Sequence, residues 1–192
     1  YLSYVLSVMS GENRRRLLAR LKTVYPPLET LSTGSMRGGW KYLNVLEHYE
    51  DGKRLITEAR HVNDGMLRLM AILAESFGAH PFLLFDEIEN GINPELVEFL
   101  LDTLRSCGKQ VMVTTHSPLI LNYLDDEAAR EGVIYLYKTP AGKTRAVRFF
   151  DIPSMAEKLS VMGPGEAYAD THLAGLAREI EDLRSDGGTP SE

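Results

Sequence analysis

Two adjacent carboxylates stand directly after a short apolar run. Asp86 and Glu87 follow Phe82–Phe85, in which every residue is apolar. Such a run predicts a strand that is buried on both faces of a parallel sheet. Ligands of open α/β sheets bind just beyond the carboxyl ends of the strands, and acids are costly there unless a cation or a reacting group needs them. One carboxylate could hold Mg²⁺ while the other polarises an attacking water. Taken alone, the pair could equally be two surface acids.

Two further stretches carry polar groups that fit the same edge of the sheet. Asn63-Asp64-Gly65 opens a predicted helix over 66–77, and the glycine lets the free backbone N–H groups of this helix start approach an anion closely. His116 ends the next predicted strand, 110–115, and a helix start at Ser117-Pro118 follows it. Parallel strands end at the same edge, so we expect the carboxylates and the histidine to face one crevice. The alternatives are a simple helix cap at residue 63 and a structural histidine.

The elements around these residues predict an α/β fold with a mostly parallel sheet and flanking helices. Strand 82–85 is followed by a helix from Asn93-Pro94 to about Ser106 and then by strand 110–115, lengths typical of a parallel sheet with crossover helices. An antiparallel meander is expected before this core and a hairpin after it. Their strands are expected at 28–36, 40–48, 54–60, 132–138 and 145–150.

Apolar residues at helical spacing predict helices within 1–9 and after Ser10, and near the C-terminus from Pro153 and over about 170–183. Gly163-Pro164-Gly165 is expected to be a loop. The helix after Ser10 carries five basic residues that could contact phosphate, although such a run is more often a solvated face. They are Arg14, Arg15, Arg16, Arg20 and Lys22.

Composition limits the classes of protein to consider. The chain has 192 residues and a net charge of −6, so no overall positive field attracts nucleic acid. Cys107 is the single cysteine, which excludes an intrachain disulfide and a cysteine-rich zinc site and fits a reducing cytosol. We expect a cytoplasmic protein without a membrane partner, because no apolar run approaches the length of a bilayer span. The chain opens at Tyr1 inside a predicted helix, so we expect a piece of a longer protein.

In order and spacing, these motifs resemble those in the C-terminal half of an ABC-type ATPase domain of the P-loop NTPase class. The resemblance is to the predicted AAA/ABC-like ATPases related to RecF, SMC and OLD-family proteins. Phe82–Glu87 resembles their Walker B strand, and Glu89–Pro94 resembles their D-loop, Glu-Asn-Gly-Leu-His-Pro, with departures at Ile92 and Asn93. Thr114–Pro118 is identical to their switch-histidine motif, Thr-Thr-His-Ser-Pro. The resemblance covers about residues 1–183.

The signature motif of that family, Ser-Asp/Gly-Gly-x-x-Arg, is similar to Asn63–Arg68, with asparagine in place of serine. The resemblance implies that Asn63, Asp64, Gly65 and Arg68 reach across a dimer interface to the γ-phosphate held by a second copy. Read alone, Arg68 could simply pair with an acid. Asn90 and Gly91 of the D-loop would form a contact between subunits.

The resemblance also implies the chemistry. Asp86 would bind Mg²⁺, Glu87 would be the general base for water that attacks the γ-phosphate of ATP, and His116 would contact and sense that phosphate. Two Mg²⁺-ATP molecules would lie between the two subunits of a homodimer. Related proteins act in DNA repair, chromosome maintenance and phage defence, and nucleic acid could be engaged through an effector outside this chain.

One necessary part is absent from the sequence. A phosphate-binding loop reads Gly-x-x-x-x-Gly-Lys-Ser/Thr, and the nearest match, Gly142-Lys143-Thr144, has Tyr137 in place of the first glycine and lies at a hairpin tip. We therefore expect a partial ATPase domain over 1–184, divided into 1–60 and 61–184, with a disordered tail over 185–192. The Walker A lobe would lie elsewhere, and the chain alone should bind ATP poorly.

Two other functions fit parts of the sequence. A non-catalytic dimerisation or scaffold module derived from an ATPase is favoured slightly by Asn63. A metal-dependent nuclease could use Asp86, Glu87 and Glu89, but it would need a further cluster of acids with a lysine on neighbouring strands, and the sequence offers none.

Overall fold

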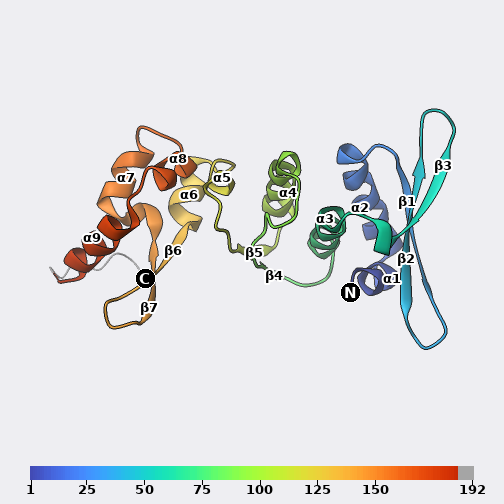
Figure 1. Ribbon diagram of the computed structural model, residues 1–192, viewed down its shortest axis with the longest axis horizontal. Coiled ribbons are helices and arrows are strands. Elements are labelled where there is room, and N and C mark those ends of the chain that lie inside the picture. The colour runs from blue at the N-terminus through green and yellow to red at the C-terminus, as the bar shows by residue number, and fades with distance from the viewer. Residues whose placement is uncertain (186–192) are drawn as a thin grey trace. The chain divides into compact units, whose positions relative to one another are not determined.

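The structure, a computed structural model, describes residues 1–185. Its contacts divide it into two compact units, the first Tyr1–Thr115 and the second beginning at His116. Figure 1 shows the order of the elements along the chain. The first unit consists of α1 (Leu2–Val8), α2 (Gly11–Val24), β1 (Leu28–Ser35), β2 (Lys41–His48), β3 (Arg54–Glu58), η1 (Ala59–His61), α3 (Asp64–Ser76), β4 (Phe82–Phe85), α4 (Pro94–Ser106) and β5 (Gln110–Val113).

Strands β1, β2 and β3 form the antiparallel meander that the sequence predicts. Leu31 of β1 lies opposite Val45 of β2, and Leu46 of β2 lies opposite Ile56 of β3. Alternate residues of a strand point to opposite faces, and Leu31 and Val45 are buried where α1 and α2 pack against the sheet. The first two helices thus cover the inner face of the meander.

Two of the five basic residues of α2 hold the first unit together. Arg14 donates hydrogen bonds to the backbone oxygens of Leu6 and Leu31. Arg20 donates to the Thr103 hydroxyl at 3.2 Å, and its guanidinium carbon lies 5.3 Å from the centre of the Phe99 ring. The interpretation of the whole run as a phosphate surface or a solvated face is therefore wrong for these two arginines.

Strands β4 and β5 form the parallel pair that positions the candidate site. Phe82 lies opposite Gln110 and Phe85 opposite Val113, with α4 as the crossover helix between them. The prediction of a parallel pair with a helical connection is confirmed. The mostly parallel sheet is not, because the described residues form three small sheets, of which the other two are antiparallel.

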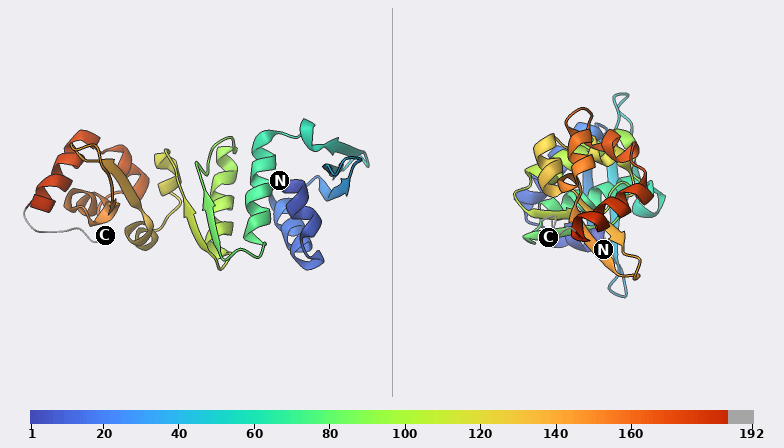
Figure 2. Two further views of the ribbon diagram at one scale, coloured as in Figure 1. Left: turned by 90° about the horizontal axis from the view of Figure 1, so that it is seen from below. Right: turned by 90° about the vertical axis from the view of Figure 1, so that its left-hand side faces the viewer.

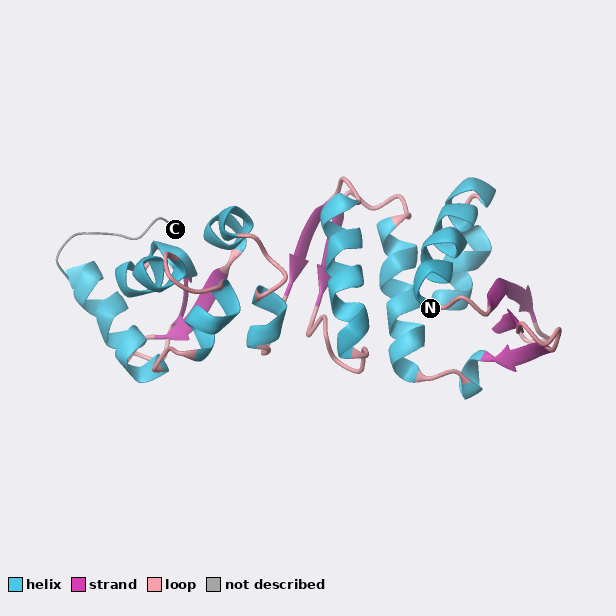
Figure 3. Cartoon of the chain, turned by 90° about the horizontal axis from the view of Figure 1, so that it is seen from above, coloured by secondary structure: helices cyan, strands magenta, loops and turns pink. Residues whose placement is uncertain are grey.

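The β4–β5 pair is buried on one face only. Helices α3 and α4 lie on the same side of the pair (Figures 2 and 3), and Leu83 is buried at 5% exposure. Phe82, Leu84 and Met112 are 47%, 61% and 53% exposed. The prediction that β4 is buried on both faces is therefore wrong for this chain, because no described element of the first unit covers its second face.

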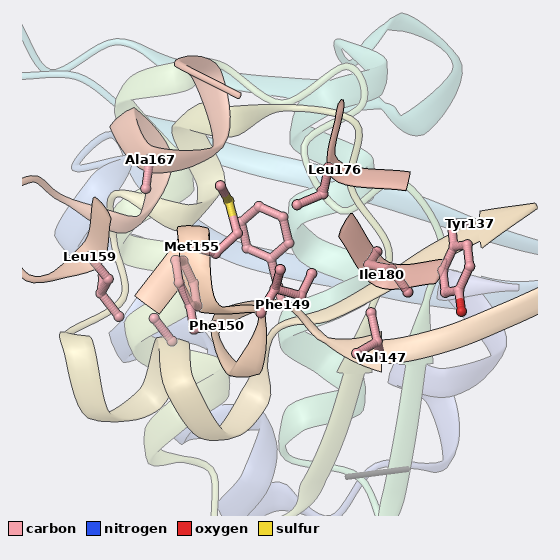
Figure 4. Packing of buried hydrophobic residues seen from close by; sticks show 11 residues of the cluster. Tyr137, Val147, Phe149, Phe150, Met155, Leu159, Ala167, Leu176 and Ile180 are labelled. Carbon is pink, nitrogen blue, oxygen red and sulfur yellow. The ribbon is translucent and has the colours of Figure 1, made fainter. Parts of the chain in front are cut away.

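The second unit surrounds a compact aromatic core. Phe149 and Phe150 are almost fully buried, with ring centres 4.9 Å apart in an edge-to-face arrangement, and Met155, Leu159 and Ile180 pack in the same cluster (Figure 4). This unit consists of α5 (Pro118–Leu121), α6 (Asp126–Gly132), β6 (Ile134–Lys138), β7 (Thr144–Arg148), η2 (Phe149–Asp151), α7 (Pro153–Leu159), α8 (Pro164–Ala169) and α9 (Leu173–Ser185).

The second unit confirms the predicted hairpin and corrects one predicted loop. Strands β6 and β7 are antiparallel neighbours, with Leu136 opposite Ala146. Gly163-Pro164-Gly165 begins α8 instead of forming a loop, because Gly163 is the N-cap and a proline in the first turn is compatible with a helix. A Cβ on Gly165 would lie 2.4 Å from the Pro118 oxygen, so the glycine permits close contact with α5.

The C-terminal tail and the domain limits remain predictions. Residue 185 closes α9, and the rest of the predicted tail, 186–192, lies outside the described residues. The division of the domain at about residue 60 also remains a prediction. None of the helices in the described part combines the length and apolar character that a membrane crossing requires.

Candidate functional site

Thr114 ties together the two carboxylate residues at the end of β4. The N–H of Thr114 donates to the Phe85 oxygen at 2.9 Å, which continues the parallel pairing one residue beyond β5. The Thr114 hydroxyl donates a hydrogen bond to Oδ1 of Asp86 and accepts one from the N–H of Glu87 at 2.8 Å. Thr114 lies within the switch-histidine motif, but its sequence context predicts no separate role for it. Its hydroxyl orients the carboxylate of Asp86 and the backbone of Glu87.

Glu87 has an unusual backbone conformation. Its φ is +47°, and it is the one non-glycine residue in the described part of the chain with positive φ. This left-handed conformation costs an L-residue roughly 1–2 kcal/mol, so neighbouring contacts must hold it. The N–H of Ile88 donates to the Thr114 oxygen at 3.1 Å, and the Ile88 side chain is buried. Asn90 donates from Nδ2 to Oε2 of Glu87 at 3.2 Å. These contacts thus hold the backbone directly after the strand and fix one carboxylate oxygen of Glu87.

Arg68 of α3 reaches the same turn. Its Nη2 donates to the backbone oxygens of Asp86 at 2.6 Å and Glu87 at 2.8 Å. Its Nε is buried and has no hydrogen-bond partner among the described residues. The alternative that Arg68 simply pairs with an acid does not describe these contacts, since both acceptors are backbone carbonyls. Sequence reasoning missed this contact because packing alone brings these distant positions together.

The start of α3 is capped by its own asparagine. Oδ1 of Asn63 accepts hydrogen bonds from the N–H groups of Gly65 at 2.8 Å and Met66 at 3.3 Å. The prediction that these groups are free to meet an anion is wrong for this structure. Asn63 and Asp64 are both exposed, and an acid in the first turn of a helix is favourably placed against the helix dipole.

Gly65 makes the closest approach in the site. A Cβ on this buried residue would lie 1.9 Å from the backbone oxygen of Gly91. Gly91 itself has φ +72°, a conformation that glycine adopts without penalty. The signature-like start of α3 therefore packs directly against the D-loop-like turn of the same chain, and a glycine is needed at position 65 for this contact.

The rest of the D-loop-like segment connects β4 to α4. Oε1 of Glu89 accepts a hydrogen bond from the Thr115 hydroxyl at 2.8 Å. Asn93, at the position of the usual histidine, is the N-cap of α4, and its Oδ1 accepts from the N–H of Glu95 at 3.2 Å. The departure at this position is therefore explained by helix capping.

The predicted site residues divide between the two units. The first unit brings together Asp86, Glu87, Arg68, Gly65 and the Asn90-Gly91 turn. His116 follows Thr115 directly, is exposed, and begins the second unit. Its approach to the carboxylates and its contact with a phosphate remain predictions.

The residues at the end of β4 fit a Mg²⁺ ion that is held mainly by a nucleotide. Mg²⁺ in nucleotide sites keeps several waters and phosphate oxygens and takes one or two carboxylates from the protein. Asp86 is exposed, and its Oδ1 is oriented by Thr114. No group of three or more His, Cys, Asp or Glu side chains that could hold a metal occurs in the part of the chain that the structure describes. The described residues of this site therefore could not hold the metal without the nucleotide and water as further ligands.

A pocket of about 510 Å³ extends from the site along α3. Its lining includes Asp86 and Arg68 of the site as well as Tyr1 and Glu75. Burial alone would raise the pKa of Glu75, but hydrogen bonds from Tyr1 and His80 lower it below its ordinary value. The hydrogen bond between Tyr1 and Glu75 also raises the pKa of Tyr1 to about 12. Glu75 is thus an ionised, hydrogen-bonded carboxylate that anchors the first residue of the chain.

The chain is similar to known proteins both in sequence and in fold. Residues 3–122 match the model of a family described as AAA domain, putative AbiEii toxin, Type IV TA system. No curated protein sequence matches the chain. A chain solved in work on the structural biochemistry of ATP-driven dimerization and DNA-stimulated activation of SMC ATPases is similar in fold, with a TM-score of 0.51 and 16% identity. The match covers 70% of this chain and 81% of that one.

Proposed function

We propose that this chain supplies the Walker B, signature and switch-histidine parts of a Mg²⁺-dependent ATPase. The proposal starts from the fact that the chain belongs to the family described as AAA domain, putative AbiEii toxin, Type IV TA system. The observation that carries this proposal is the turn at the end of β4. There Asp86 is exposed and oriented by Thr114, and Glu87 is held in a left-handed conformation.

The proposed reaction is hydrolysis of the γ-phosphate of ATP. The Glu87 carboxylate accepts a proton from a water molecule while the water oxygen forms a bond to the γ-phosphorus. The bond from that phosphorus to the bridging oxygen breaks, and ADP and phosphate leave. Asp86 would hold Mg²⁺, which would supply positive charge to neutralise the phosphate oxygens. His116 donates a hydrogen bond to a γ-phosphate oxygen and so responds to its presence.

The exposed face of the β4–β5 pair supports a further lobe in the working protein. Phe82, Leu84 and Met112 present apolar side chains on this face. A pair of strands is marginal alone and is stabilised by a sheet or helices that cover it. A lobe that carries the phosphate-binding loop, contributed from outside this chain, would cover these residues and hold the nucleotide beside Asp86.

The proposed active form is a dimer that holds ATP between two copies of the domain. The exposed Asn63 and Asp64 at the start of α3 would face the nucleotide of the second copy. Asn63 can keep Oδ1 in its cap and offer Nδ2 to a phosphate oxygen. This assembly would serve either DNA maintenance or phage defence, the roles in which related proteins act.

One observation favours a second candidate, a dimerisation or scaffold module without catalysis. The cap by Asn63 occupies two N–H groups that a phosphate would otherwise bind. A module of this kind would keep the fold and the dimer contact but would not hydrolyse ATP. The nuclease alternative has no comparable support, because beyond Asp86, Glu87 and Glu89 it would need a further cluster of acids with a lysine on neighbouring strands, and the sequence offers none.

The test is ATP hydrolysis by the intact protein that contains this chain. Glu87→Gln should reduce kcat by roughly 10²–10⁴-fold, the range for loss of a general base, while ATP still drives dimerisation. Glu98→Gln, on the exposed side of α4, is the matched control and should hydrolyse ATP as the wild type does. If the intact wild type dimerises with ATP but does not hydrolyse it, the scaffold function replaces the enzymatic one.

A further inference from the structure

Two backbone oxygens converge on one nitrogen of Arg68. Nη2 of Arg68 lies 2.6 Å from the oxygen of Asp86 and 2.8 Å from the oxygen of Glu87. Carbonyl oxygens that approach one point repel each other unless a donor lies between them. A charged guanidinium is a strong donor for this purpose, because hydrogen bonds from an ionised group are stronger than those between neutral groups.

We propose that Arg68 is a positioning residue that acts within its own subunit and holds Glu87 in the left-handed conformation. The side chain of an L-residue opposes φ +47°, and such a conformation persists only where the surroundings determine it. Arg68 stabilises the backbone arrangement in which the oxygens of residues 86 and 87 lie together. Its effect on the reaction depends on the proposed function, while its effect on the backbone does not.

The other contacts fix different atoms of Glu87. Thr114 accepts from its N–H, Asn90 donates to Oε2 of its carboxylate, and Arg68 donates to its carbonyl oxygen. The N–H, the carbonyl and the side chain of Glu87 are therefore each held by a different residue. Of these three, Arg68 is the one that comes from α3, the helix whose start the proposed dimer would place beside the second nucleotide.

This role differs from the one that the family resemblance implies for Arg68. Contact with a phosphate of the second copy would require the guanidinium to reach outward from the subunit. In the structure Nη2 is engaged by two carbonyls of its own chain and Nε is buried. The two roles predict different results for the same substitution.

Lysine keeps the positive charge and a hydrogen-bond donor, and its use for this purpose has a precedent in this chain. The ammonium of Lys109 donates to three backbone oxygens at the end of α3 and in the following loop, those of Glu75, Gly78 and His80. An ammonium can therefore hold converging carbonyls. Arg68→Lys should restore part of what Arg68→Met removes, because methionine retains length and packing but has no donor.

The first arm of the test is structural. A crystal structure of the intact Arg68→Met protein should show residue 87 outside the left-handed region, whereas Arg68→Lys should keep it there. Arg15→Met, at an exposed position of α2, is the matched control and should leave the turn unchanged. If Arg68→Met retains φ near +47° at residue 87, the proposal is wrong, and this result does not depend on any ATPase activity.

The second arm is kinetic. Arg68→Met should lower kcat by about 10²-fold, the loss that follows from a small misplacement of a catalytic group, with KM within about twofold because ground-state binding is unchanged. In a Glu87→Gln background the same substitution should leave ATP-driven dimerisation unchanged. Loss of that dimerisation would assign Arg68 to the second nucleotide and overturn the proposal. If the wild type hydrolyses no ATP, the proposed function fails, and the structural arm still decides the role of Arg68.

Discussion

Thr114 accepts a hydrogen bond from the backbone N–H of Glu87 at 2.8 Å, so the segment that leads to the predicted switch histidine also holds the predicted general base. The same hydroxyl donates to Asp86. The predicted metal ligand and the predicted base are thus contacted by one side chain, which lies one residue beyond β5. A change at position 114 should therefore affect both the carboxylate of Asp86 and the backbone of Glu87.

Thr114→Val should therefore reduce both stability and activity. The substitution keeps the shape but leaves the N–H of Glu87 without its acceptor, a loss of about 1–3 kcal/mol in the free energy of unfolding. Thr114→Ser retains the hydroxyl and should retain most of both properties. Urea denaturation and steady-state ATP hydrolysis measure the two effects. Equal activity of the valine and serine variants would show that the hydroxyl does not orient the site.

Gly65→Ala should disrupt the contact between α3 and the D-loop-like turn. Its Cβ would lie 1.9 Å from the Gly91 oxygen, and the backbone shift that relieves such a clash costs typically 1–3 kcal/mol. Gly11→Ala is the matched control, because it lies in α2 with nothing within 4 Å of its Cβ. We expect it to be neutral or to stabilise the chain by up to about 1 kcal/mol. A Gly65→Ala variant as stable as the control would contradict the observed packing.

Glu47 should make the stability of the first unit depend on acid pH. Its side chain is buried at 6% exposure, and although burial raises its pKa, hydrogen bonds from Tyr25, Thr57 and Tyr49 lower it below the ordinary 4.5. A folded pKa below the unfolded one stabilises the protein above the unfolded pKa, and this contribution is lost as pH falls through the folded value.

The corresponding measurement is the free energy of unfolding between pH 7 and pH 3. It should fall below about pH 4.5, and Glu47→Gln should be less stable at pH 7 and should lose less on acidification. Glu12→Gln, exposed on α2, serves as the control. An unchanged acid limb in Glu47→Gln would show that other carboxylates cause the loss.

Leu84→Lys should affect the intact protein more than the isolated chain. Leu84 is 61% exposed in this structure, so a lysine there costs the chain little, whereas a covering lobe would bury its charge at considerable cost. Leu136→Lys, at a residue that is 60% exposed on β6, is the comparison. Thermal unfolding of both variants in both contexts gives the answer. If Leu84→Lys lowers the unfolding temperature of the intact protein no more than that of the isolated chain, no lobe covers this face.

The sequence predicts local structure better than it predicts which segments pack against one another. Asn93-Pro94 correctly predicts the start of α4, since capping depends on adjacent residues. The apolar run of β4 correctly predicts a strand but not its one-sided burial, because burial depends on what covers the strand. Helix α6, capped by Asp125, was not expected from its polar sequence.

The site follows the same division. Asp86 and Glu87 lie where the motif predicts them, at the end of β4, because a strand end is a local feature. The roles of Arg68 and Thr114 depend on tertiary contacts between distant segments, which periodicity and spacing do not reveal. The occupied N–H groups of α3 depend on the rotamer of Asn63, which the sequence leaves open.

The most direct test of the central claim is a crystal structure of the intact Glu87→Gln protein with Mg²⁺ and ATP. We expect the metal beside the Asp86 carboxylate and a water in line with the γ-phosphate, within about 2.6–3.2 Å of the side chain at position 87. A nucleotide bound away from the end of β4, or a γ-phosphate whose attacking water is held by another residue, would contradict the claim that this turn is the hydrolytic site.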